Sequence, residues 1–294
     1  MKRFKQARNY PAGFLPAHVE HCRRLLAAMP CPVTLQWNQC EVFAEFDGWW
    51  LSSEFFPLAR SHDGGEVFSH YAARLRIHGQ FGQAIPADWL FAMNYAEQKT
   101  LALLRLIRVL HLLNHVGRHG SDTGLRIDLD LRIDSAPRIC RAHSEHIVDF
   151  TAELLDVLAL PAAQLRLLLF VDAATVEAGR SLLARYRALR HPLALGGFGA
   201  GANDLLALWT LEPDALVLDP RYSRLAVVYP SVRQQLQVLL PSLLLQGFAL
   251  GVDGVSCGQM HALARSLQAS LLSGPLISER LSPAAQPAAM ALSA

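Results

Sequence analysis

The stretch LALGGFGAGANDLLALWTLEPDALVLD, residues 193–219, decides the fold of this chain. It begins with a short apolar run that, together with Pro192, predicts a strand over 192–195. A glycine-rich turn then leads to a segment over 203–211 that predicts a helix, and a second apolar run predicts a strand over 215–218. A strand, a helix and a further strand in this order form the repeating unit of an α/β protein with parallel strands.

The same alternation extends in both directions along the chain. Apolar residues at period two predict a strand over 124–130 (GLRIDLD), and a continuous apolar run predicts a buried strand over 164–172 (QLRLLLFVD). Amphipathic segments over 147–160, 176–189 and 232–246 predict helices. This order requires right-handed crossovers with helices covering the strands, and periodicity alone allows either a closed β/α barrel or a doubly wound sheet.

Composition limits the classes of function. The chain has 294 residues, 52% of them hydrophobic, which suffices for one large core. Its net charge is +2 and only 18% of its residues are charged, so neither direct DNA binding nor membrane association is expected. The apolar run over 238–252 is interrupted by polar residues and is too short to cross a bilayer.

The cysteines and the N-terminal residues predict a cytoplasmic location. The five cysteines are odd in number and form no CxxC pair, which argues against a disulfide framework and a zinc site: Cys22, Cys31, Cys40, Cys140 and Cys257. Residues 1–8 are basic, but no continuous apolar stretch follows them, so no signal peptide is predicted.

Taken together, these segments resemble the EAL domain family. Residues 193–219 align without a gap with the family's segment from the Asp-Asp-Phe-Gly-Thr-Gly loop to the Lys-Ile-Asp strand end, and residues 253–281 resemble its Glu-Gly-Val-Glu-Thr turn and the following helix. Residues 55–58 (FFPL) resemble the Tyr-Gln-Pro-Ile strand, and residues 70–74 (HYAAR) stand where Glu-Ala-Leu is expected, in one of two registers. The positions that match the two long segments are Phe198, Gly199, Gly201, Leu205, Leu208, Leu211, Asp214, Asp219, Gly254, Val255, Leu263, Arg265, Leu267, Gly274, Leu276, Ser278 and Leu281.

The resemblance implies a fold and a domain organisation. The fold is α/β, a modified (β/α)8 TIM-like barrel of EAL type with an N-terminal extension. The extension covers residues 1–50, the degenerate EAL domain 51–281, and a disordered Ala/Pro-rich tail 282–294.

The resemblance also implies that catalysis has been lost. EAL enzymes hydrolyse cyclic-di-GMP with two divalent metals held by carboxylates and an asparagine, and a lysine helps to orient the attacking water. Carried over position by position, most of these groups are replaced. The corresponding positions are His70 or Tyr71, Asp128, Leu169, Gly196, Gly197, Val217, Asp253 and Ser256. Since only Asp128 and Asp253 are carboxylates, no catalytic residue, no metal and no other cofactor is predicted.

A barrel that keeps its apolar residues and loses its charged centre is expected to act through its surface. We therefore expect a catalytically inactive regulator that represses gene expression, as degenerate relatives do for virulence genes. It would do so by contacting a transcription factor or response regulator rather than DNA. Homodimerisation through the helix near residues 203–209 is an open possibility.

Two alternatives belong to other functional classes. A non-hydrolysing cyclic-di-GMP sensor requires Arg74 to face the mouth of the barrel. A weak metal-dependent phosphodiesterase would have to use Asp128 and Asp253.

Other residue patterns are better explained without a special site. His111, His115 and His119 recur every four residues, but Gly117 and Gly120 indicate that their helix ends there. His18, His21 and Cys22 lack a second pair of ligands at a zinc-like spacing and favour an ordinary helix surface. The glycines of residues 196–201 do not have the spacing of a dinucleotide-binding loop.

Overall fold

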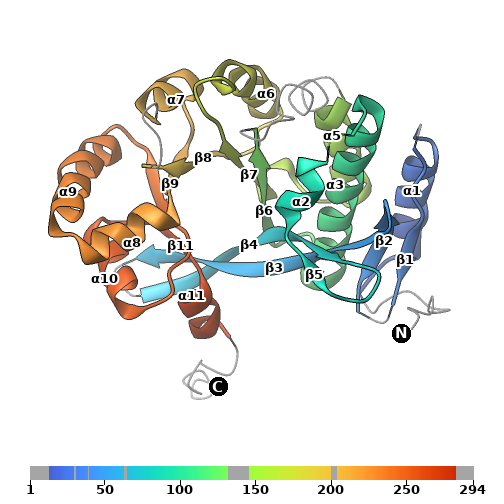
Figure 1. The fold of residues 1–294 in the computed structure, drawn as a ribbon, viewed down its shortest axis with the longest axis horizontal. Helices are drawn as coiled ribbons and strands as arrows, with labels where there is room; N and C mark the ends of the chain where they lie inside the picture. The colour runs from blue at the N-terminus through green and yellow to red at the C-terminus, as the bar shows by residue number, and fades with distance from the viewer. Residues whose placement is uncertain are drawn as a thin grey trace, which may run out of the picture.

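A closed barrel forms the centre of the molecule. The structure, a computed structural model, describes residues 13–29, 31–38, 40–62, 65–93, 95–131, 146–199 and 204–282. Within these residues eight strands close the barrel (Figure 1), in the order β3 (Trp49–His62), β4 (Gly65–His78), β6 (Gly124–Asp130), β7 (Leu165–Phe170), β8 (Leu193–Phe198), β9 (Ala215–Leu218), β10 (Ala249–Val252) and β11 (Leu271–Ser273). The expected modified β/α barrel is therefore confirmed.

Strand β3 runs against both of its neighbours in the barrel. It pairs antiparallel with β4 and with β11, whereas β4, β6, β7, β8, β9, β10 and β11 pair parallel in turn. Strands β3 and β4 each have 14 residues and form a long hairpin. This single reversed strand distinguishes the barrel from one built only of parallel β/α units.

The helices lie outside the ring of strands, as a parallel barrel requires. The predicted helices over 147–160, 176–189, 203–211 and 232–246 correspond to α5 (Val148–Val157), α6 (Val176–Ala188), α7 (Asp204–Leu211) and α9 (Pro230–Leu245). The remaining helices of the barrel are α3 (Glu97–His119), α8 (Pro220–Val228), α10 (Gly258–Ser266) and α11 (Pro275–Arg280). Among the described residues, no helix is both long and apolar enough to cross a bilayer.

Local sequence signals set the ends of several helices. Helix α3 ends at His119, and the next residue, Gly120, adopts a φ of 80° that favours glycine. Helix α8 begins with Pro220 directly after Asp219, whose carboxylate accepts a hydrogen bond from the backbone N–H of Arg221. The carboxylate of Asp172 accepts hydrogen bonds from the backbone N–H groups of Ala174 and Thr175, in the turn before α6.

Strand β6 shows how alternation builds two layers. Leu125, Ile127 and Leu129 are buried against the surrounding helices, whereas Arg126 and Asp128 point into the barrel. The period-two pattern that predicts this strand therefore also determines which of its polar side chains meet inside.

The N-terminal segment is built onto the barrel hairpin. Strands β1 (Leu35–Trp37) and β2 (Val42–Phe46) extend the sheet from the first half of β3, and α1 (Pro16–Ala27) contacts α3. The expected boundary at residue 50 lies inside β3. Short elements β5 (Ala84–Ile85) and α2 (Ala87–Ala92) follow β4. From residue 283 onward, the expected tail lies outside the described residues. Cys140 also lies outside them, and the other four cysteines are free thiols.

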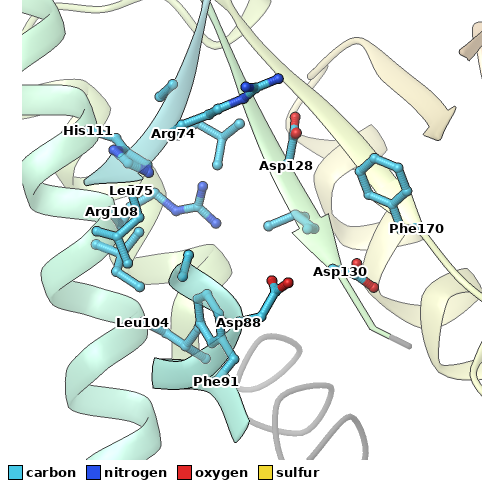
Figure 2. A pocket seen from close by; sticks show the side chains of 15 residues that line it. Arg74, Leu75, Asp88, Phe91, Leu104, Arg108, His111, Asp128, Asp130 and Phe170 are labelled. Atoms are coloured by element: carbon cyan, nitrogen blue, oxygen red, sulfur yellow. The ribbon is translucent and has the colours of Figure 1, made fainter. Parts of the chain in front are cut away.

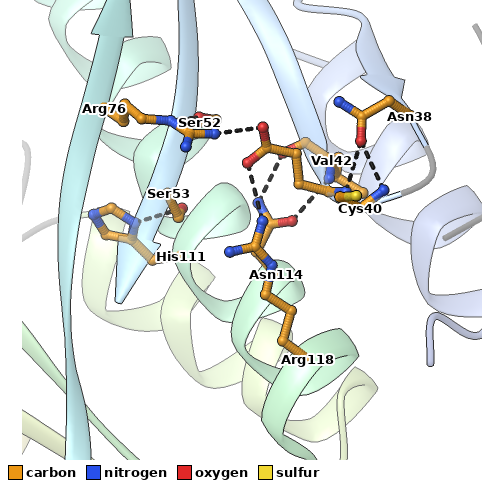
Figure 3. A network of polar contacts seen from close by, with 10 residues as sticks. Asn38, Cys40, Val42, Ser52, Ser53, Arg76, His111, Asn114 and Arg118 are labelled. Carbon is orange, nitrogen blue, oxygen red and sulfur yellow. Dashed lines mark hydrogen bonds and ion pairs between the residues drawn. The ribbon is translucent and has the colours of Figure 1, made fainter. Parts of the chain in front are cut away.

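A polar network fastens this segment to the barrel (Figure 3). The Glu41 carboxylate pairs with the guanidinium of Arg76 from β4 and with that of Arg118 from α3. The side chain of Asn114 accepts a hydrogen bond from the backbone N–H of Val42 and donates one to its carbonyl, each at 2.8 Å. Each of these bonds joins the segment before β3 to the barrel hairpin or to α3.

Candidate functional site

Part of the site predicted from the sequence, including Asp128, lies where the carboxyl ends of the parallel strands meet, which is where β/α barrels carry their functional groups. A pocket of about 400 Å³ opens there between β4, β6, β7, α2 and α3. Arg74, Asp128, Asp130 and Phe170 line it from the strands, as Figure 2 shows. Asp253, which follows β10, lies deeper inside the barrel.

The guanidinium of Arg126 joins the two retained carboxylates. Its Nη1 and Nη2 donate hydrogen bonds of 3.1 and 2.8 Å to the two carboxylate oxygens of Asp253, and its Nε lies 3.2 Å from an oxygen of Asp128. The hydroxyl of Ser273 donates a further hydrogen bond of 2.6 Å to Asp253. Because the Arg126 side chain is only 7% exposed, this is a buried ion cluster inside the barrel.

The electrostatics of this cluster hold Asp253 ionised. Burial by itself opposes ionisation, but the Arg126 guanidinium and the Ser273 hydroxyl keep the pKa of Asp253 below its ordinary value. Burial also acts against the charge of Arg126, yet Asp253 and Asp128 raise the pKa of its guanidinium. The pKa of Asp128 is raised, because burial outweighs its attraction to Arg126, although its side chain remains 36% exposed to the pocket.

The two candidates for the family's first glutamate point in opposite directions. His70 lies inside the barrel, is 1% exposed, and contacts the Ser69 hydroxyl. Burial and the nearby charges of Arg166 and Arg126 lower the pKa of His70 to about 3, so its imidazole is neutral. Tyr71 points outward and stacks on His119 of α3, with 3.8 Å between ring centroids.

Arg74 lies on the same face of β4 as His70 and reaches the mouth pocket. Its guanidinium lies 4.6 Å from the centroid of the Phe56 ring. A deeper cavity of about 270 Å³ is lined by His70 together with Arg60 and Arg166.

Leu169 is buried and points away from the pocket. Its side chain lies close to Gly179 of α6, and it is the next residue, Phe170, that reaches the mouth. The Phe170 ring lies over Gly196, where an added methyl group would come within 2.5 Å of a ring carbon. An aromatic ring and a glycine therefore stand together at this part of the mouth.

The remaining predicted positions offer little polar chemistry. Gly197 adopts a φ of 70°, at an irregularity in the pairing of β8 with β9. Val217 is buried and lines the deeper cavity, and the Ser256 hydroxyl donates a hydrogen bond to the sulfur of Met260. In the part of the chain that the structure describes, no three His, Cys, Asp or Glu side chains are placed to hold a metal ion.

The residues present do not fit a pair of divalent metals. A permanently charged guanidinium lies between Asp128 and Asp253, and a dication close to these carboxylates would meet its repulsion. The other carried-over positions supply imidazole, apolar side chains or no side chain in place of anionic ligands.

The histidines of α3 are divided among separate contacts. His111 shares a hydrogen bond of 2.8 Å with the Ser53 hydroxyl, and burial together with Arg108 lowers its pKa to about 3. His115 pairs with the carbonyl of Thr123, and His119 stacks on the tyrosine described above. The helix does end at His119, as predicted, but His111 and His115 are buried rather than surface residues.

Sequence reasoning missed Arg126, Phe170 and Arg108 as residues of the site. Arg126 precedes Asp128 by two positions in a predicted strand, so alternation already places both on one face. Arg166 gives the same signal in the next strand and assigns Phe170 to the interior. No sequence pattern marks Arg108, because the helix around it is apolar on most sides.

Comparisons with known proteins agree with this geometry. No protein-family model matches the sequence, and no curated protein matches it. Solved structures do match: a standalone EAL protein of Vibrio cholerae O395 bound to c-di-GMP has a TM-score of 0.62 at 15% identity, over 78% of this chain and 91% of that one. The FimX EAL domain of Xanthomonas citri, in complex with c-di-GMP, has a TM-score of 0.62 at 18% identity, over 79% of this chain and 87% of that one.

The barrel has the fold of EAL domains. The EAL enzyme Bd1971 in its cAMP-bound form is a further match, with a TM-score of 0.60 at 14% identity over 78% of this chain. This chain spans 62% of the length of that enzyme. At these identities the likeness concerns the fold, and the side chains of the site must be judged from this chain itself.

Proposed function

We propose that this chain is a catalytically inactive, degenerate EAL-type regulator that acts in the cytoplasm by binding and not by hydrolysis. The observation that carries the proposal is the ion cluster of Arg126 with Asp128 and Asp253. A guanidinium pairs with both carboxylates, but unlike a bound metal it cannot lower the pKa of a water molecule by direct coordination. The fold is retained while the groups for two-metal chemistry are replaced.

Exposed apolar side chains support a role in protein contact. On α7, the exposed fractions of Leu205, Leu206 and Trp209 are 50%, 53% and 55%. On α9, Val238 is 74% and Leu245 is 90% exposed. Large apolar residues exposed close together on one helix, as on α7, are typical of surfaces that bind other proteins. The partner that fits the proposal is a transcription factor or response regulator, through which the protein represses genes such as virulence genes. The same exposed residues of α7 also suit pairing with a second copy of this chain.

A first experiment tests catalysis. Purified protein is incubated with cyclic-di-GMP and excess Mg²⁺ or Mn²⁺, and products are separated by chromatography. We expect no hydrolysis, because no activated water forms beside Arg126. Metal-dependent product that disappears in Asp128→Ala would reject the proposal and favour a weak phosphodiesterase.

A second experiment tests the protein contact. Genes that change expression when the coding gene is deleted are measured again after complementation with wild type, with Leu206→Lys, or with Arg180→Gln as a control on another exposed helix. We expect wild type and the control to restore repression and Leu206→Lys to fail, while circular dichroism shows the same fold for all three. Equal repression by all three proteins, or a sequence-specific gel shift by the purified protein alone at physiological salt, would contradict indirect repression through this surface.

A second candidate function is a non-hydrolysing cyclic-di-GMP sensor. The position of Arg74 at the mouth favours it, because a guanidinium there is suited to pair with a phosphate. Calorimetry with cyclic-di-GMP decides: heat of binding that Arg74→Gln abolishes would support the sensor, and absence of heat would leave the protein contact alone.

A further inference from the structure

The inner wall of the mouth pocket carries a buried arginine without a hydrogen-bond partner at two of its nitrogens. Arg108 on α3 is 3% exposed, and its Nε and Nη1 atoms make no hydrogen bond. Figure 2 shows its guanidinium directed from α3 into the pocket, between Arg74 and Asp88. Burying an unpaired charge is costly, so a ligand that enters the pocket and pairs with this guanidinium would stabilise the folded chain.

The acidic side chains of the pocket do not neutralise Arg108. Asp128 pairs with Arg126, deeper in the barrel, and Asp88 is exposed on α2. Asp130 also lines the pocket, and no ion pair joins Arg108 to any residue that the structure describes. His111, one turn further along α3, is neutral because burial and Arg108 lower its pKa to about 3.

The rest of the pocket is largely apolar. Leu75, Phe91, Leu104, Ile107 and Phe170 line it around Arg108. A mainly apolar pocket with a few charged groups directed inward is the usual form of a site for a small amphipathic ligand. Its volume of about 400 Å³ is within the ordinary range of such sites.

We propose that this pocket binds a small organic monocarboxylic acid, whose carboxylate pairs with Arg108 and whose apolar body lies against Phe91, Leu104 and Ile107. A carboxylate matches the two parallel donors of a guanidinium. A single negative charge suits the pocket better than a phosphate dianion, because Asp88 and Asp130 also line the pocket and oppose additional negative charge. This ligand class is separate from cyclic dinucleotides and goes beyond the proposed function.

The test measures thermal unfolding of the full chain with benzoate, hexanoate or inorganic phosphate, for wild type and for Arg108→Met. At a roughly tenfold excess over the dissociation constant, we expect a carboxylate to raise the Tm of wild type by a few degrees and to leave Arg108→Met unchanged. Without ligand, Arg108→Met is expected to melt at a higher temperature than wild type, because a buried unpaired charge is replaced by an apolar chain of similar length. Arg105→Met is the matched control on the same helix, since its guanidinium lies over the Phe150 ring and not in the pocket.

Four results would overturn the proposal. A lower Tm of ligand-free Arg108→Met would show that the guanidinium already has a stabilising partner. Equal carboxylate effects on wild type and Arg108→Met would place binding elsewhere, and a stronger effect of phosphate than of either carboxylate would reject the ligand class. Saturation-transfer NMR with benzoate, read for wild type and both variants, checks binding independently of stability, and absence of transfer with wild type also counts against the proposal.

Discussion

Replacing Arg126 by methionine should remove the positive centre of the barrel while keeping a side chain of similar length. Asp253 would lose two hydrogen bonds of 3.1 and 2.8 Å and keep only that from Ser273. Its side chain is 15% exposed, so water replaces the lost partner poorly. Removing one partner of a buried ion pair costs about 3–5 kcal/mol, and we expect Arg126→Met to lower the free energy of unfolding by roughly that amount.

Urea unfolding followed by circular dichroism measures this loss, and a double variant isolates its cause. Asp253→Asn in the Arg126→Met background removes the charge that has lost its partner, so the double variant should be more stable than Arg126→Met alone. The coupling between the two sites is expected to be about 1–3 kcal/mol. Ser181→Ala on the exposed face of α6 serves as a control with little effect.

The pH dependence of the free energy of unfolding provides a second test with the same variant. In wild type the folded-state pKa of Asp253 is lowered, so its contribution to stability is present above the unfolded pKa of about 3.9 and is lost as the pH falls through the folded value. Without Arg126, burial raises the pKa of Asp253. Protonation of Asp253 on acidification then removes its unpaired buried charge and with it part of the variant's loss of stability. The stability difference between wild type and Arg126→Met should therefore shrink as the pH falls from 7 towards 4. A difference below about 1 kcal/mol at pH 7, or one that grows on acidification, would refute this reasoning.

Three further predictions test other contacts. Gly196→Ala should lower the free energy of unfolding by about 1–3 kcal/mol, because its methyl group meets the Phe170 ring, and Phe170→Leu should recover part of that loss in urea titrations. Glu41→Gln should cost about 1–3 kcal/mol and make the segment before β3 cleave faster in limited proteolysis; an unchanged cleavage rate would count against its anchoring role. Glu66→Gln should lower stability at pH 7 but hardly at pH 3, because the pairing of Glu66 with His261 and Arg280 lowers its pKa despite burial, and that stabilisation is lost on acidification; an equal effect at both pH values would contradict the ion pair.

The sequence predicts the barrel well where polar and apolar residues alternate. The pattern GLRIDLD fixes β6 and assigns its faces, because each polar residue of the strand falls at an inward position. In QLRLLLFVD the central positions are all apolar, so Arg166 alone marks the inward face. The family resemblance places a ligand position at Leu169, whereas Phe170 reaches the pocket. Which residues form the site depends on which side of each strand faces the barrel interior, and a run of apolar residues gives little information on that orientation.

Long-range contacts could not be predicted at all. Nothing near Asp253 in the sequence indicates that Arg126, on a strand far away in the chain, holds its carboxylate. Likewise, the order of apolar segments does not show that β3 runs against its neighbours or that β1 and β2 extend it. Such features arise from closure of the barrel, which joins segments without any local signal.

The shared hairpin of β3 and β4 sets a limit on how this protein can be divided. Residues 49–51 of β3 pair with β2, whereas residues 58–60 of the same strand pair with β11 and close the barrel. A fragment that starts at residue 51 would expose the edge of a barrel strand and remove the partners of two arginines. The described residues before β3, from residue 13, and the barrel should therefore unfold in a single cooperative transition. Recombinant versions that omit this N-terminal segment are expected to aggregate.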